Sequence, residues 1–459
     1  MAAKKVLVLL SSDRYAYPLI RFLVEVGKKS GFKTMIGAMF DAGIVERIRE
    51  DKISTDLNFV HISKIQECDQ AIRKSDLIIG MITDSLLLQV ADSCISHRKT
   101  LISPARLNRQ MVLKKAHAKE NNVLILMDCG FSPGLDHITA KKAIDNIHYK
   151  GGKISSFRTY SGTFVTGDST DNCRDFKLSE PFSELLSWGR HNNRHLSQGR
   201  MRHIPGHRLF ERSEIVNIRE LENTIAIPEG DSLYYKKIYD LTDAHTVVKG
   251  KLARKGFGRM WDLLIRLGFT DTNSRIDLDG VSSFENFLDS LVPFSESSSL
   301  EHRLCDYTGA NMEDIKKLKW LGLFDSSWVE GTGETTPANL LQHLMEIRLT
   351  PQAHDRDRVV MEHQLGYDFR DEHHEFKATI ILEGENQKDS ALAKVIGYTC
   401  GAAAKSVLSG SIGVKGINIP IIKEIYDPIL NELEDLDIAF HITEKKDQTE
   451  EMNSDMQLS

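Results

Sequence analysis

The six residues from Ser11 to Ala16 lie where a nucleotide would bind if the chain begins with a dinucleotide-binding unit. The apolar residues Val6–Leu10 before them predict a buried strand. After them come Pro18 and an apolar series at helical spacing: Leu19, Phe22, Leu23 and Val26. This order of strand, tight turn and helix is typical of a unit that holds a pyrophosphate at the helix N-terminus. The turn lacks the glycines that this fold normally has there, so cofactor binding is the central question.

The candidate cofactor-binding residues are the turn and one carboxylate after the second predicted strand: Ser11, Ser12, Asp13, Arg14, Tyr15, Ala16 and Asp41. Ala16 is small enough for close packing of helix on strand. Asp13 puts a carboxylate where phosphate charges would lie; alternatively, Asp13 or Ser12 caps the helix. Asp41 is placed to bond a ribose hydroxyl, which favours NAD over NADP, or is a solvated loop carboxylate. The expected cofactor is NADP or NAD.

A basic stretch between residues 190 and 208 contains five arginines and four histidines: Arg190, Arg194, Arg200, Arg202, Arg208, His191, His195, His203 and His207. It either reaches an acidic ligand or forms a solvated edge. The His191 and His195 spacing is that of a zinc-binding helix, but Asn192 stands where that motif has glutamate. We therefore predict no metal site. His363, His373 and His374 are expected on the surface of a hairpin.

Composition indicates a globular protein of two or three domains, because 459 residues are too many for one core. The formal net charge of −6 argues against a general affinity for nucleic acid or an anionic membrane. No apolar run approaches the roughly 18 residues of a membrane span, and the first residues do not resemble a signal peptide. The six scattered cysteines are typical of reduced thiols in a cytoplasmic protein. Cys129 is either a reactive thiol or another buried one.

The order of predicted elements indicates the fold class. Residues 1–130 alternate between strand and helix patterns, as a doubly wound parallel sheet requires. Between Lys153 and Leu252 the alternation predicts an antiparallel sheet, with one segment at Arg208–Phe210. Later segments predict helices over about 255–350, a hairpin that turns at Arg370–His374, a small-residue helix at Ser390–Ser409 and a disordered polar tail from Thr443.

Six blocks of the chain resemble the glutamate-forming saccharopine dehydrogenases, also called saccharopine reductases, in their order and spacing. The blocks are Phe131–His137, Asp231–Tyr239, Ala244–Gly256, Gly384–Gln387, Ala391–Gly397 and Gly416–Tyr426. The resemblance implies an α/β fold, a Rossmann-type doubly wound parallel sheet with an inserted α+β substrate and dimerisation domain and a helical subdomain. The domains would be 1–130 (completed by about 390–442), 131–254 with 355–389, 255–354, and a tail at 443–459.

The resemblance also implies an activity: NAD(P)-dependent interconversion of saccharopine with aminoadipate semialdehyde and glutamate, in lysine metabolism. It implies a homodimer that acts on a small amino-acid substrate. Catalytic residues are not assigned. The substrate-binding candidates are Ser132, Asp136, His137, Ser161, Gly162, Lys177, Ser179 and Asp231.

This sequence departs from the family pattern at its ligand positions. Ser132 replaces the first Asp of the family loop, and Ser161-Gly162-Thr163 replaces Cys-Gly-Gly. In the Asn-Arg-Asp-Ser block, Gly230 replaces the arginine, a natural clamp for a substrate carboxylate. That loss removes a charge-assisted pair of about 1.5–3 kcal/mol. The alternative hypothesis is thus a degenerate member that serves as a dimeric ligand-sensing or structural module without hydride transfer.

Overall fold

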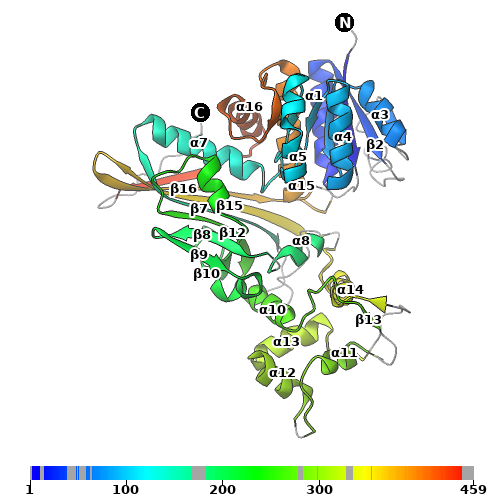
Figure 1. Ribbon diagram of the computed structural model, residues 1–459, viewed down its shortest axis with the longest axis vertical. Helices are drawn as coiled ribbons and strands as arrows, with labels where there is room; N and C mark the ends of the chain where they lie inside the picture. The colour runs from blue at the N-terminus through cyan, green and yellow to red at the C-terminus, as the bar shows by residue number, and fades with distance from the viewer. Residues whose placement is uncertain are drawn as a thin grey trace. The chain divides into compact units, whose positions relative to one another are not determined.

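The computed structural model describes most of the chain, in the ranges 3–10, 15–38, 48, 50, 58–61, 65–166, 182–189, 191–277, 283–296, 298–326, 334–352, 354–387 and 389–446. The chain divides into two compact units. Figure 1 shows the helices and strands, coloured along the chain. The first unit comprises Met1–Ile154, Ile238–Asp240 and Leu365–Ser459, and the second comprises Ser155–Lys237 and Leu241–Gln364. None of the helices in these ranges is long and apolar enough to cross a membrane.

The first unit is built on a parallel sheet of seven strands. They are β1 (Lys4–Leu10), β2 (Phe32–Ala38), β3 (Asn58–His61), β4 (Leu77–Met81), β5 (Thr100–Ile102), β6 (Leu124–Leu126) and β17 (Gly416–Asn418). Their order is β17-β6-β5-β4-β1-β2-β3, with every pair parallel. The order reverses between β1 and β4, as in a Rossmann-type sheet. The predicted doubly wound fold is confirmed.

Helices of this unit come from both ends of the chain. They are α1 (Ala16–Ser30), α3 (Ile65–Arg73), α4 (Asp84–Ser96), α5 (Arg109–Leu113), α6 (Lys115–Glu120), α7 (Leu135–Tyr149), α15 (Ala391–Ser409) and α16 (Lys423–Glu434). Helix α15 packs closely on α1 because glycines stand at the contact. A Cβ at Gly397 would lie 2.8 Å from the backbone nitrogen of Leu19, and one at Gly401 would lie 2.4 Å from the ring of Phe22. The C-terminal helix thus completes the first core.

The second unit contains a mixed sheet. Its strands are β7 (Lys153–Thr166), β8 (Asn193–Ser197), β9 (Arg200–Ile204), β10 (Glu214–Ile215), β11 (Thr224–Pro228), β12 (Thr246–Arg254) and the first part of β15 (Arg356–Phe369). Strand β12 pairs antiparallel with β11 but parallel with β7, so the prediction of an antiparallel sheet was wrong at that pair. The predicted segment Arg208–Phe210 is not a strand either; it lies in two 3₁₀ turns, Gly206–Arg208 and Phe210–Arg212.

The predicted hairpin is confirmed, and a third strand near the C-terminus pairs with it. Strand β15 turns into β16 (Glu372–Glu383) through Arg370 and Asp371, which both have positive φ as a two-residue hairpin turn requires. Strand β18 (His441–Lys446) pairs antiparallel with β16. The tail predicted to be disordered from Thr443 is therefore ordered through Lys446, because backbone pairing and a bond from Tyr367 to Glu444 stabilise it. Residues 447–459 lie outside the described part of the chain.

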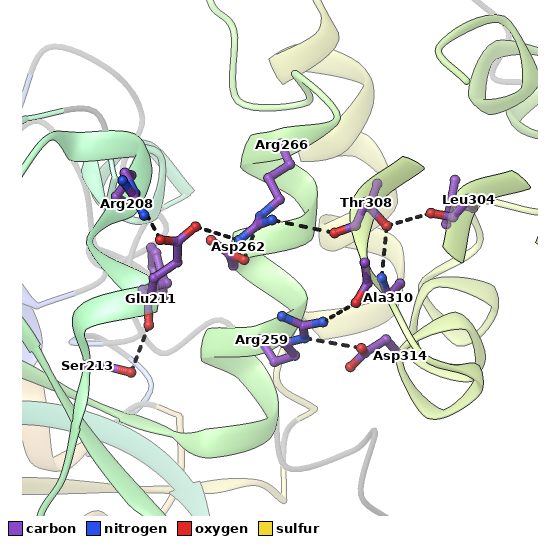
Figure 2. A network of polar contacts seen from close by, with 12 residues as sticks. Arg208, Glu211, Ser213, Arg259, Asp262, Arg266, Leu304, Thr308, Ala310 and Asp314 are labelled. Atoms are coloured by element: carbon purple, nitrogen blue, oxygen red, sulfur yellow. Dashed lines mark hydrogen bonds and ion pairs between the residues drawn. The ribbon is translucent and has the colours of Figure 1, made fainter. Parts of the chain in front are cut away.

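A helical layer follows β12. It contains α10 (Lys255–Arg266), α11 (Phe284–Ser290), α12 (Leu300–Thr308), α13 (Met312–Leu321), α14 (Pro337–Leu349) and a short β13–β14 pair (Ile276–Asp277, Glu334–Thr335). Its apolar core surrounds the fully buried Trp261. Figure 2 shows how polar side chains join α10 to its neighbours. Arg259 binds Asp314 and the carbonyl of Gly309, and Arg266 binds Asp262 and Glu211. The predicted helical region is therefore anchored by charge as well as by apolar packing.

Candidate functional site

The cofactor crevice of a Rossmann-type sheet lies where the strand order reverses, here at the carboxyl ends of β1 and β4. Five of the seven cofactor candidates, Ser11, Ser12, Asp13, Arg14 and Asp41, lie outside the described residues. Tyr15 is the N-cap residue of α1, and Ala16 begins the helix fully buried. No acidic residue occupies the first turn of α1. The first turn of the helix therefore carries no negative charge that would oppose an anion at its N-terminus.

Two substrate candidates lie together in the loop before α7. The Ser132 hydroxyl donates to Asp136 Oδ2 at 2.9 Å, and the Gly134 amide donates to Asp136 Oδ1 at 2.6 Å. The His137 amide also donates to Oδ1, at 2.9 Å. Asp136 is buried, so its carboxylate is used to hold the loop and the first turn of α7. This arrangement makes Asp136 a residue that shapes the site.

His137 lies in a buried chain of polar groups. Its Nε2 lies 3.3 Å from Asp128 Oδ2, and its Nδ1 lies 2.7 Å from the Tyr239 hydroxyl. Asp128 Oδ1 accepts a further bond from the Leu107 amide at 2.6 Å. Nε2 thus faces a carboxylate oxygen, and Nδ1 faces a hydroxyl that can either donate or accept a hydrogen bond. All three side chains are almost inaccessible, which fixes the orientation of the imidazole.

The remaining substrate candidates belong to the second unit. Ser161 and Gly162 are adjacent on β7, and both are buried. A Cβ at Gly162 would lie 2.7 Å from Leu252, so glycine is needed there for strand packing. Lys177 and Ser179 lie outside the described residues.

Asp231 is joined to an arginine of the basic stretch. The Arg194 guanidinium donates to both carboxylate oxygens of Asp231, and its amide donates to the Gly230 carbonyl at 3.0 Å. A Cβ at Gly230 would meet no atom within 4 Å, although its φ of +53° favours glycine. An ion pair thus lies beside Gly230, with the guanidinium of Arg194 held at the loop.

A buried lysine that was not among the predicted site residues lies next to the same loop. Lys249 on β12 is 2 % exposed, and its Nζ lies 2.9 Å from the Tyr235 hydroxyl and 4.0 Å from Glu229 Oε2. The Lys249 backbone binds the loop through the Ser232 hydroxyl and the Glu229 amide. A lysine directly after two valines in the predicted strand Lys249–Leu252 was the signal that could have revealed it.

Burial decides two other questions that the sequence raised. Cys129 is fully buried and burial raises the pKa of its thiol, so it is not an activated nucleophile. His363, expected at the surface, is buried and lies 2.9 Å from the Thr159 hydroxyl. His195 Nδ1 lies 2.6 Å from Asn193 Oδ1. Across the described ranges, no three His, Cys, Asp or Glu side chains gather as metal ligands.

Curated proteins similar in sequence are enzymes of one group. Saccharopine dehydrogenase [NADP(+), L-glutamate-forming] of Pyricularia oryzae is 26% identical over 379 residues, which cover 80% of this chain and 84% of that protein. The enzyme of the same name from Saccharomyces cerevisiae is 25% identical over 378 residues, with 80% and 84% covered. The mitochondrial alpha-aminoadipic semialdehyde synthase of Rattus norvegicus is 25% identical over 453 residues, which cover 96% of this chain but only 48% of the synthase.

A solved structure shows the same fold. The apo histidine-tagged saccharopine dehydrogenase (L-Glu forming) from Saccharomyces cerevisiae matches with a TM-score of 0.85 at 22% identity, covering 97% of this chain and 100% of that one. Residues 130–438 match the family described as the saccharopine dehydrogenase C-terminal domain. Since this match spans more than half of the 459 residues, the chain belongs to the saccharopine dehydrogenase family, as a divergent member.

Proposed function

We propose that this protein is an NADP- or NAD-dependent oxidoreductase that interconverts saccharopine with aminoadipate semialdehyde and glutamate. The observation that carries the proposal is the extent of the likeness: enzymes named for this reaction align over four fifths of both chains. The Rossmann-type sheet and the start of α1 suit a dinucleotide. When bound, the cofactor exchanges a hydride with the carbon of an imine, while water or an amine adds or leaves. The chain's own residues would bind and orient the charged substrate.

The test is direct binding followed by turnover. Purified protein is titrated with NADPH and NADH, with nicotinamide fluorescence as the readout, and saccharopine-dependent reduction of NADP or NAD is then measured. Saturable micromolar binding with turnover is the expected result. No binding of either nucleotide at millimolar concentration would contradict the proposal and favour the degenerate alternative, which the substitutions at Ser132 and Gly230 motivate.

We propose further that Arg194 supplies the positive charge that Gly230 lacks. Its guanidinium is half exposed and already lies at the loop, held by Asp231. Replacing Arg194 by glutamine should raise KM for saccharopine severalfold, since a charge-assisted contact to the substrate is lost, with NADPH binding unchanged. Arg200→Gln, an exposed change on the neighbouring strand β9, is the control. Equal KM values for the two variants would exclude this role for Arg194.

Three further expectations from the sequence stay proposals. The chain would act as a homodimer. Sedimentation at several protein concentrations tests this oligomeric state.

The protein would reside in the cytoplasm, where its buried thiols stay reduced. Fluorescent tagging of the protein in cells tests this location. Its substrate-binding and dimerisation domain would be 131–254 with 355–389, separate from the helical subdomain, which limited proteolysis tests.

A further inference from the structure

The second unit has a cavity of about 600 Å³, a volume that suits a small metabolite. Its floor is formed by buried residues of three adjacent strands: Tyr160 of β7, Ala226 and Pro228 of β11, and Gly250 of β12. A Cβ at Gly250 would lie 3.2 Å from the Tyr160 ring, so the glycine makes room for that ring. The β8–β9 hairpin and the two 3₁₀ turns supply the walls.

The walls are strongly basic. Four arginines line the cavity against one glutamate: Arg158, Arg202, Arg208, Arg212 and Glu214. His195 and His203 also line it, and burial lowers the pKa of His195, so that ring is neutral at pH 7. Burial raises the pKa of Tyr160 to about 12, so its hydroxyl remains protonated and able to donate. The cavity therefore offers many donors and an excess of positive charge.

Three of the four arginines have no ion-pair partner in the part of the chain that the structure describes. Arg208 binds Glu211, which Arg266 shares, as Figure 2 shows. The guanidinium groups of Arg158, Arg202 and Arg212 make no ion pair with any described residue. Guanidinium groups converging on one space match phosphate and carboxylate groups, which they bind in a bidentate manner.

The cavity lies on the face of the sheet opposite Lys249. Successive side chains of a strand point to opposite faces. Val248 and Gly250 line the cavity, so Lys249 between them points away, towards Tyr235. Likewise Tyr160 lines the cavity while Thr159, its neighbour, contacts His363. The cavity is thus distinct from the cluster beside the Glu229–Ser232 loop.

We propose that this cavity binds a small polyanion, a molecule that carries two or more phosphate or carboxylate groups. A second copy of the chain is a poorer occupant, because a two-fold contact through the rim would bring the same arginines together. The recessed floor and the small volume also fit a metabolite better than a macromolecule.

The experiment is isothermal titration calorimetry of the full chain with tripolyphosphate and with citrate, at constant ionic strength set by potassium chloride. At least one of the two should bind saturably, and which of them binds identifies phosphate or carboxylate as the recognised group. The double variant Arg158→Gln/Arg212→Gln should weaken that binding about tenfold or more, because two charge-assisted contacts are lost. The control is Arg219→Gln, an exposed arginine paired with Glu220 outside the cavity, which should leave binding unchanged.

The variants also locate the anion. Binding that survives the double variant lies elsewhere, for example at the start of α1, and overturns the proposal, as does the absence of binding of both anions. A third outcome also overturns the proposal. The unchanged protein binds neither anion, and the double variant differs from it in sedimentation mass. The arginines then belong to a contact between two copies of the chain. If the double variant does not give a cooperative thermal transition, the single variant Arg202→Gln on the exposed hairpin replaces it, with a smaller expected loss because only one charge-assisted contact is removed.

Discussion

Replacing Gly134 by alanine should lower the free energy of unfolding of the first unit by about 4 kcal/mol or more. Gly134 has a φ of +145°, which residues with a side chain rarely adopt. A Cβ there would lie 2.2 Å from the carbonyl oxygen of Gly130 and 2.3 Å from its nitrogen. The backbone cannot simply rotate away, because the Gly130 amide donates to Pro133 and the Gly130 carbonyl accepts from Leu135. Urea unfolding followed by circular dichroism measures the change.

Gly31→Ala separates conformational strain from the steric clash. Gly31 ends α1 with a φ of +73°, but a Cβ there would meet no atom within 4 Å. That variant should lose only about 1 kcal/mol. Similar losses in the two variants would mean that the loop before α7 relaxes around the added methyl group, contrary to the close approach of Gly130 and Gly134.

The parallel sheet could be predicted because its signals are local. Each apolar strand, such as Val6–Leu10, is followed by an amphipathic helix, and that alternation permits few topologies. The pairing of β7 with β12 could not be predicted in the same way. Alternation of apolar residues reports one buried face, but not which distant strand lies alongside or in which direction. His363 was misplaced for the same reason, since its partner Thr159 is remote in sequence.

The candidate sites show the same limit. The basic stretch was visible in the sequence, including Arg202 and Arg208, but Arg158 and Arg212 lie outside it and join the cavity only through the fold. Lys249 was hidden within an apolar strand because its partners, Tyr235 and Glu229, belong to the preceding loop and helix. A sequence pattern identifies the chemical groups that are present. Which of them share a site depends on the fold, because it determines which side chains are buried and which lie on the same face of a sheet.

Replacing His137 by leucine should lower the free energy of unfolding of the first unit by about 3–5 kcal/mol. The leucine fills most of the imidazole volume, so the loss comes from polar groups and not from a cavity. Asp128 Oδ2 loses its 3.3 Å contact with Nε2, and the buried carboxylate is left with only the Leu107 amide on its other oxygen among the described residues. Thermal and urea unfolding measure the loss.

Two companion variants decide whether Asp128 is the cause. Tyr239→Phe removes only the hydroxyl bonded to Nδ1 and should cost about 1 kcal/mol. Adding Asp128→Asn to His137→Leu removes the unpaired charge, so the double variant should be more stable than His137→Leu alone. If the loss of unfolding free energy in the double variant equalled the sum of the losses in the two single variants, the two side chains would act independently. The 3.3 Å contact between them would then contribute nothing to stability. Recovery of stability would instead show that the histidine is retained because its ring partners a carboxylate that the loop before α7 keeps buried.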